Sequence, residues 1–75
     1  MKQPKREHPY PNNVRLLRWE RGWTLKELSR YTGISATLLD RIEKWDKETS
    51  LEELLALEKA FNAPPWMVLG DARYF

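Results

Sequence analysis

Apolar side chains recur at helical spacing in five short segments of this chain, and polar or glycine-containing stretches separate them. The pattern predicts a first helix over residues 12–21, with Asn12 or Asn13 supplying the N-cap oxygen, and a second helix over 24–32. The residues that support both helices are the terminating glycines Gly22 and Gly33, the capping box of Thr24 and Glu27, and the inward positions Val14, Leu17, Leu25 and Leu28.

Three further helices are predicted downstream. Ser35 is the expected N-cap of a helix that continues to Trp45, and a second capping box, Ser50 with Glu53, opens a helix that ends at Asn62. A last short helix runs from the proline pair at 64–65 to residue 69, because proline suits a first helical turn. The expected inward positions are Leu38, Leu39 and Ile42 in the third helix, and Leu51, Leu54, Leu55, Leu57 and Phe61 in the fourth.

No segment alternates apolar and polar residues long enough to form a strand, so an all-α domain of five short helices is expected. The chain divides into a flexible basic arm over residues 1–11, a helical domain over 12–70 and a short tail over 71–75. The arm contains three prolines and has no apolar periodicity.

The composition excludes most enzyme and cofactor classes. With 75 residues the chain fits one small domain, and with no cysteine it offers neither a thiolate zinc site nor a cysteine nucleophile. Its one histidine, His8, lies between prolines of the arm, away from any partner base. We therefore expect no enzyme, no metal, no other cofactor and no small-molecule ligand. No apolar run approaches the roughly 20 residues that cross a bilayer, so a cytoplasmic protein without a membrane partner is expected.

The net charge of +2 is unevenly distributed. Residues 1–23 carry six basic and two acidic side chains, a net charge of +4, whereas residues 51–75 carry two basic and four acidic side chains, a net charge of −2. This asymmetry suggests that a polyanion faces the N-terminal half of the chain.

Four motifs keep the spacing of a known family. They read VRLLR at 14–18, GWTLKELS at 22–29, GISATLLDRIE at 33–43 and SLEEL at 50–54. Together they resemble the DNA-binding domain of the phage repressor and Cro (XRE-type) family. The resemblance implies a lambda-repressor-like fold with a helix-turn-helix in the second and third helices, and a third helix that enters the DNA major groove.

The resemblance also implies an ion pair between Arg18 of the first helix and Glu43 of the third, which would fix the angle between the two helices. Judged from the residues alone, the alternative is a pair of surface charges worth about 0–1 kcal/mol.

Helical spacing of 100° places one polar face of the third helix opposite Leu39 and Ile42. On this face Arg41 is the strongest candidate base reader, because its guanidinium can bond guanine O6 and N7 together. Its alternative role is a solvated side chain paired with Glu48 or Asp40. The resemblance implies base contacts from Ala36, Thr37, Asp40 and Arg41.

Leu25 departs from the family pattern, which commonly has a glutamine here that reaches a phosphate. This contact is therefore either absent or replaced by Lys26 and the N–H groups at the start of the second helix, since helix N-termini attract phosphates. The arm either contributes Lys2, Lys5 and Arg6 to a minor groove or is only a solvating tail. The expected phosphate contacts are Asn13, Arg15, Thr24, Lys26 and Lys44.

Bulky apolar residues exceed the family pattern. Trp45 stands where the family usually has a helix-ending glycine, so the third helix is expected to run longer. Leu16, Trp19, Trp23 and Trp66 are interpreted as packing residues of a small core or as part of a partner surface. The expected twofold dimer contacts are Trp66, Met67, Tyr74 and Phe75.

Two functions are compatible with these observations. The first is a sequence-specific, repressor-like transcriptional regulator that binds double-stranded DNA as a homodimer. The alternative is a helix-turn-helix fold used as a protein-interaction module, such as a repressor modulator or an antitoxin-like partner, with weak or no DNA binding. Leu25, Ala36, Leu38 and Asp40 motivate this alternative, in which the partner is a second regulatory protein.

Overall fold

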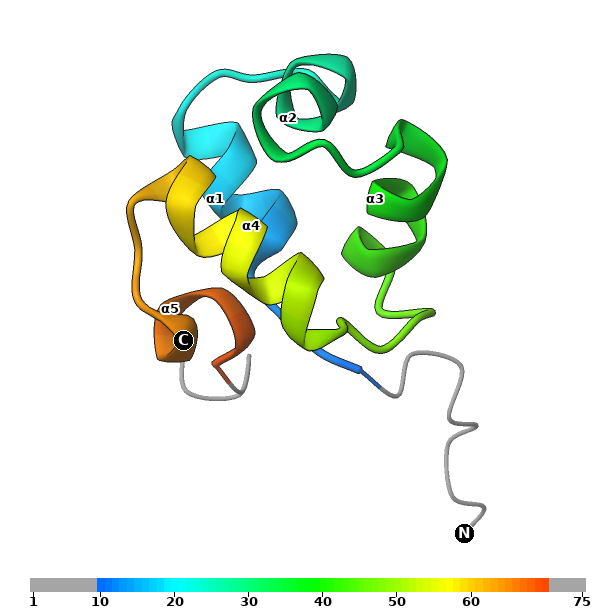
Figure 1. Ribbon diagram of the computed structural model, residues 1–75, viewed down its shortest axis with the longest axis vertical. Helices are drawn as coiled ribbons and strands as arrows, with labels where there is room; N and C mark the ends of the chain where they lie inside the picture. The colour runs from blue at the N-terminus through cyan, green and yellow to red at the C-terminus, as the bar shows by residue number, and fades with distance from the viewer. Residues whose placement is uncertain (1–9, 71–75) are drawn as a thin grey trace, which may run out of the picture.

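The computed structural model describes residues 10–70 and contains five helices (Figure 1). No strand occurs within this range, so the prediction of an all-α fold is confirmed. The arm residues Lys2, Lys5 and Arg6, and Tyr74 and Phe75 of the tail, lie outside the described range. The helices are α1 (Val14–Glu20), α2 (Leu25–Thr32), α3 (Ala36–Glu43), α4 (Leu51–Phe61) and α5 (Pro65–Leu69).

Side-chain caps define the starts of α2, α3 and α4. Both expected capping boxes are present, with the Thr24 hydroxyl accepting from Glu27 N at the start of α2 and the Ser50 hydroxyl accepting from Glu53 N at the start of α4. Ser35 caps α3 by accepting from Leu38 N. These local bonds satisfy backbone donors that the first helical turn leaves without a partner.

The cap of α1 comes from Asn12. Asn13 occupies the N-cap position without a side-chain capping bond, while Asn12 Oδ1 accepts from Val14 N at 2.9 Å. The Asn12 amide group also donates to Ile42 O of α3 at 2.8 Å. Asn12 thereby joins the start of α1 to the end of α3.

One hydrophobic core lies between the five helices. Figure 1 shows α4 crossing in front of α1, with α2 above, α3 beside and α5 below this pair. The fully buried large side chains of the core are Val14, Leu28, Leu39, Ile42, Leu57, Phe61 and Val68, and Leu17 is nearly so.

The prediction that Leu51 and Leu55 point inward is wrong, since they are 70% and 53% exposed. At 100° per residue, Leu54, Leu57 and Phe61 share one side of α4, whereas Leu51 and Leu55 lie about 90–130° away from its centre. The neighbouring helices cover only the side that carries Leu57 and Phe61. Two leucines of α4 therefore face solvent.

The prediction that α3 extends to Trp45 is also wrong. The helix ends at Glu43, and Trp45 adopts a left-handed backbone with φ of 64°. Trp45 N donates to Ile42 O and Asp46 N to Arg41 O, the pair of bonds that closes a Schellman motif. This conformation costs a residue with a Cβ about 1–2 kcal/mol. The Trp45 indole N–H offsets part of that cost by donating to Asn12 O at 3.1 Å.

Glu53 supports the start of α4 through its charge. Burial on its own raises the pKa of Glu53, but hydrogen bonds from Lys47 and Ser50 outweigh this effect and lower the pKa below its ordinary value of 4.5. A lowered pKa in the folded state stabilises the fold above the unfolded pKa, and this stabilisation is lost as the pH falls through the folded pKa.

We expect Glu53→Gln to remove part of the acid sensitivity of the fold. At pH 7 the variant should be less stable by about 1 kcal/mol, because the charged bond to Lys47 is lost while glutamine can still cap. Below the folded pKa of Glu53 the two proteins should converge. Denaturant unfolding between neutral and strongly acidic pH measures the difference, and a constant gap at all pH values would contradict the prediction.

Candidate nucleic-acid interface

The turn between α2 and α3 holds two short helices at a fixed angle. Gly33 ends α2 with φ of 78°, and its N–H donates to Ser29 O at 2.8 Å. The Thr32 hydroxyl donates to Leu28 O and accepts from Ile34 N at 3.1 Å. Ile34 then enters the core, so the turn is anchored on both sides.

A buried carboxylate ties α3 to α1. The Glu43 side chain is fully buried and accepts two bonds from Arg18, at 2.6 Å from Nε and 2.9 Å from Nη2. Arg18 Nη1 also donates to Trp23 O. The hydrogen bond with Glu43 raises the pKa of Arg18 above its ordinary value. The pair expected from the family resemblance is thus in contact, with α3 held through both carboxylate oxygens.

Arg15 forms a third member of this network. Its Nε lies 3.2 Å from Glu43 Oε1, and its guanidinium lies 5.8 Å from the centroid of the Trp19 ring. Its side chain is 42% exposed, compared with 12% for that of Arg18. One buried carboxylate is therefore shared by two arginines, and the network keeps a net charge of about +1.

The solvent side of α3 presents the expected reading face. Ala36, Thr37 and Arg41 are exposed, and Asp40 is partly exposed. Within residues 10–70, no hydrogen bond or ion pair engages the Arg41 guanidinium, so neither Glu48 nor Asp40 holds it. Arg41 is therefore accessible at the surface of α3.

Asp40 is paired one turn along the same helix. Its Oδ2 lies 3.1 Å from Lys44 Nζ, and the two side chains are 39% and 56% exposed. Lys44 makes a further interaction as well. The negative charge on the reading face is thus partly neutralised by a residue of the same face.

The start of α2 carries an exposed threonine and an exposed lysine. The backbone N–H of Thr24 donates to Glu27 Oε1, so the capping box already occupies this donor. Leu25 packs against the core, and Lys26 is exposed. Of the candidate phosphate contacts here, Lys26 offers an exposed positive charge, whereas the exposed Thr24 has its N–H already bonded.

The predicted phosphate contact Asn13 and the predicted dimer contacts Trp66 and Met67 lie outside the helix-turn-helix. Asn13 is 8% exposed and its amide group donates to Met67 O at 2.9 Å, which leaves little of it to meet a phosphate. Trp66 of α5 is 65% exposed, whereas Met67 packs partly against the core.

Sequence reasoning missed two residues that brace α3. Asn12 bonds α3 through Ile42 O, and Trp45 bonds back to Asn12 O. The spacing of Arg15 and Arg18, three residues apart on one helix face, is a signal that could have assigned both arginines to Glu43. No comparable signal marks Asn12, because its partner lies 30 residues away in the chain.

Comparison with known proteins agrees with this geometry. The family model described as helix-turn-helix matches residues 14–65, from α1 to the first residue of α5. A protein of Pyrococcus horikoshii, named as a candidate HTH-type transcriptional regulatory protein, is 41% identical over 51 residues. The match covers 68% of this chain and only 16% of that relative. No solved structure gives a significant match. Among the described residues, no helix is both long and apolar enough to span a membrane.

Proposed function

The chain belongs to the XRE-type helix-turn-helix family, and from this premise we propose that it is a non-enzymatic, DNA-binding regulator of transcription that reads the major groove with α3. The observation that carries the proposal is the accessible Arg41 guanidinium on a helix that Arg18 and Glu43 hold in place. A rigid helix with an accessible bidentate donor suits recognition of guanine.

Neighbouring side chains on α3 would complete the reading face. The methyl groups of Ala36 and Thr37 can pack against thymine methyl groups, and Asp40 can accept from a cytosine amino group. Lys26 and Lys44 would contact phosphates on either side, with Arg15 and Thr24 as further candidates. The basic side chains Lys2, Lys5 and Arg6 are proposed as contacts of the arm.

We further propose repressor-like action in the cytoplasm as a homodimer. The exposed Trp66 ring supports a twofold contact, which Met67, Tyr74 and Phe75 would extend. Such a dimer would space two copies of α3 about 34–36 Å apart, one DNA turn, on a palindromic site.

Fluorescence anisotropy on a mixed-sequence DNA duplex, repeated across a salt series, tests the proposal. Binding should weaken with salt at a slope of about −0.9 in log K for each phosphate contact. Lys26→Ala should reduce the slope by about one contact, whereas Lys59→Ala, an exposed lysine on α4, should leave the slope unchanged.

Absence of binding at low salt would contradict the proposal. It would favour instead the protein-interaction module, in which α3 contacts a second regulatory protein. The acidic Asp40 on the reading face and the partly buried Leu25, which packs against the core, are the observations that favour this second candidate.

A further inference from the structure

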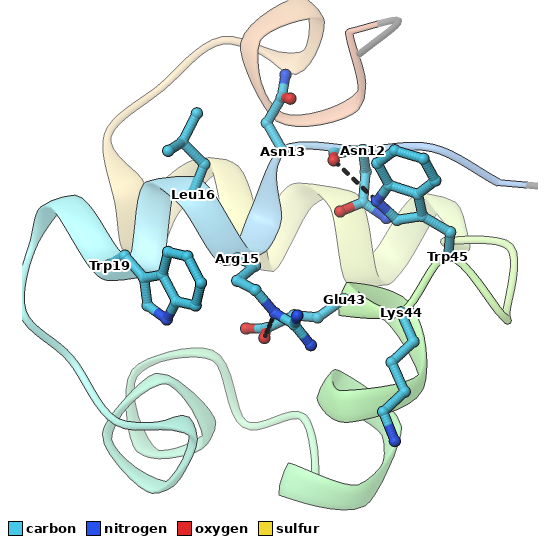
Figure 2. A pocket seen from close by; sticks show the side chains of 8 residues that line it. All are labelled: Asn12, Asn13, Arg15, Leu16, Trp19, Glu43, Lys44 and Trp45. Atoms are coloured by element: carbon cyan, nitrogen blue, oxygen red, sulfur yellow. Dashed lines mark hydrogen bonds and ion pairs between the residues drawn. The ribbon is translucent and has the colours of Figure 1, made fainter. Parts of the chain in front are cut away.

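A solvent-open groove of about 430 Å³ lies between α1 and the end of α3, beside the proposed reading face. Figure 2 shows Trp19 and Trp45 at opposite ends of this groove, with Arg15 between them. Trp19 is 61% exposed and Leu16 is 48% exposed. We call this surface the Trp19 groove; it is lined by Asn12, Asn13, Arg15, Leu16, Trp19, Glu43, Lys44 and Trp45.

The charge of the Trp19 groove favours an acidic occupant. Its one carboxylate, Glu43, is fully buried and already bonded by Arg18 and Arg15. Arg15 uses only its Nε in that bond, so both of its terminal NH₂ groups lack a hydrogen-bond partner within residues 10–70. The groove therefore offers a bidentate carboxylate site between two apolar ends.

A complementary surface exists on α4 of the same chain. Leu51 and Leu55 are 70% and 53% exposed and lie one helical turn apart. Glu52 beside them is exposed and pairs with no cation in the described part of the chain. We call these three residues the Leu51 face. Two apolar anchors at i and i+4 with an adjacent acid match the way that amphipathic helices dock into grooves.

We propose that the Leu51 face of one copy docks into the Trp19 groove of a second copy. Leu51 and Leu55 would fill the space between Trp19 and Trp45, and Glu52 would accept from Arg15. The local charge favours this pairing, since the groove carries the terminal NH₂ groups of Arg15 and the Leu51 face carries the Glu52 carboxylate, which pairs with no cation in the described residues. The contact uses none of the base-reading residues of α3, but it would occupy Arg15, one of the further candidates for a phosphate contact.

The placement of the two surfaces makes the contact head-to-tail. In Figure 1 α4 lies in front of α1, whereas Figure 2 looks onto the groove with α1 in front and α4 behind it. One copy therefore uses its groove toward one neighbour and its Leu51 face toward another. Such a heterologous contact extends beyond two copies unless the rotation closes a ring.

Sedimentation equilibrium tests the proposal in a Trp66→Ala background, which removes the proposed twofold contact. The mean mass should rise beyond that of a dimer between about 10 µM and about 1 mM, a range suited to a small interface. Trp19→Ala and the pair Leu51→Ala with Leu55→Ala should each weaken association at least about tenfold. Tyr31→Ala, an aromatic residue that is 58% exposed on α2, is the matched control and should have no effect.

Mixing the Trp19→Ala variant with the variant that carries Leu51→Ala and Leu55→Ala tests whether the groove of one copy binds the Leu51 face of another. The groove variant retains its Leu51 face and the face variant retains its groove, so together they should form a complex of two copies and nothing larger. Circular dichroism verifies that each variant is folded. A background protein that stays monomeric throughout, a mixture that forms no complex, or an equal effect of Tyr31→Ala would each overturn the proposal.

Discussion

Replacing Arg18 with methionine is expected to lower the free energy of unfolding by about 3–5 kcal/mol. The change leaves the Glu43 carboxylate fully buried with only the half-exposed Arg15 beside it. Removing one partner of a buried pair is costly because the remaining charge has lost both water and its counter-ion. A chain of 75 residues has a total stability of roughly 4–11 kcal/mol, so much of the fold's stability depends on this contact. Denaturant unfolding at pH 7 measures the loss.

Arg15→Met is the matched control for this experiment. It removes a bond to the same carboxylate, but from a side chain that is 42% exposed rather than 12% exposed. Its effect should be about 0–1 kcal/mol, the range of surface pairs. The double change Arg18→Met with Glu43→Leu should recover much of the loss, since a buried pair can be replaced by apolar groups. If Arg18→Met and Arg15→Met lowered the free energy of unfolding equally, Arg18 would not be the main partner of Glu43.

Replacing Arg41 with alanine is expected to remove most of the preference for guanine at one position of each half-site. A bidentate contact to guanine provides about 1–3 kcal/mol of discrimination, which is about 5- to 150-fold in affinity. The effect should be large because the other residues of the α3 face offer mainly methyl groups and one acid. Selection of binding sites from a random duplex library, with the parent and the variant in parallel, measures the change.

Arg41→Lys separates base reading from charge. Lysine keeps the positive charge but lacks the planar pair of donors that fits guanine O6 and N7. The lysine variant should therefore retain the salt dependence of binding while losing much of the guanine preference. If the alanine variant selected the same sites as the parent protein, specificity would not come from Arg41.

The head-to-tail contact proposed above would be independent of both results. Its surfaces, the Trp19 groove and the Leu51 face, include neither Arg18 nor Arg41; of the replaced residues, only Arg15 of the control and Glu43 of the double change line the groove. Loss of DNA binding would leave self-association unchanged, and a monomeric protein could still bind its site. The two proposals can therefore fail separately.

The positions of the helices were largely determined by the sequence, because the signals that begin and end a helix are local. Thr24 with Glu27 and Ser50 with Glu53 form their capping boxes within four residues. Gly33 ends α2 in a left-handed backbone conformation, which glycine adopts at no steric cost. The family motifs added the pairing of Arg18 with Glu43, which periodicity alone left open.

The tertiary structure decided what is covered, where α3 stops and which polar groups remain accessible. Leu51 and Leu55 fit the apolar pattern of α4, yet no neighbouring helix reaches that side. Trp45 takes a left-handed conformation, and part of its cost is offset by the indole bond to Asn12, 33 residues earlier in the chain. A sequence pattern reports the preference of each segment for burial or for a helical turn. Only packing determines which of those preferences are met, since the partners come from distant parts of the chain.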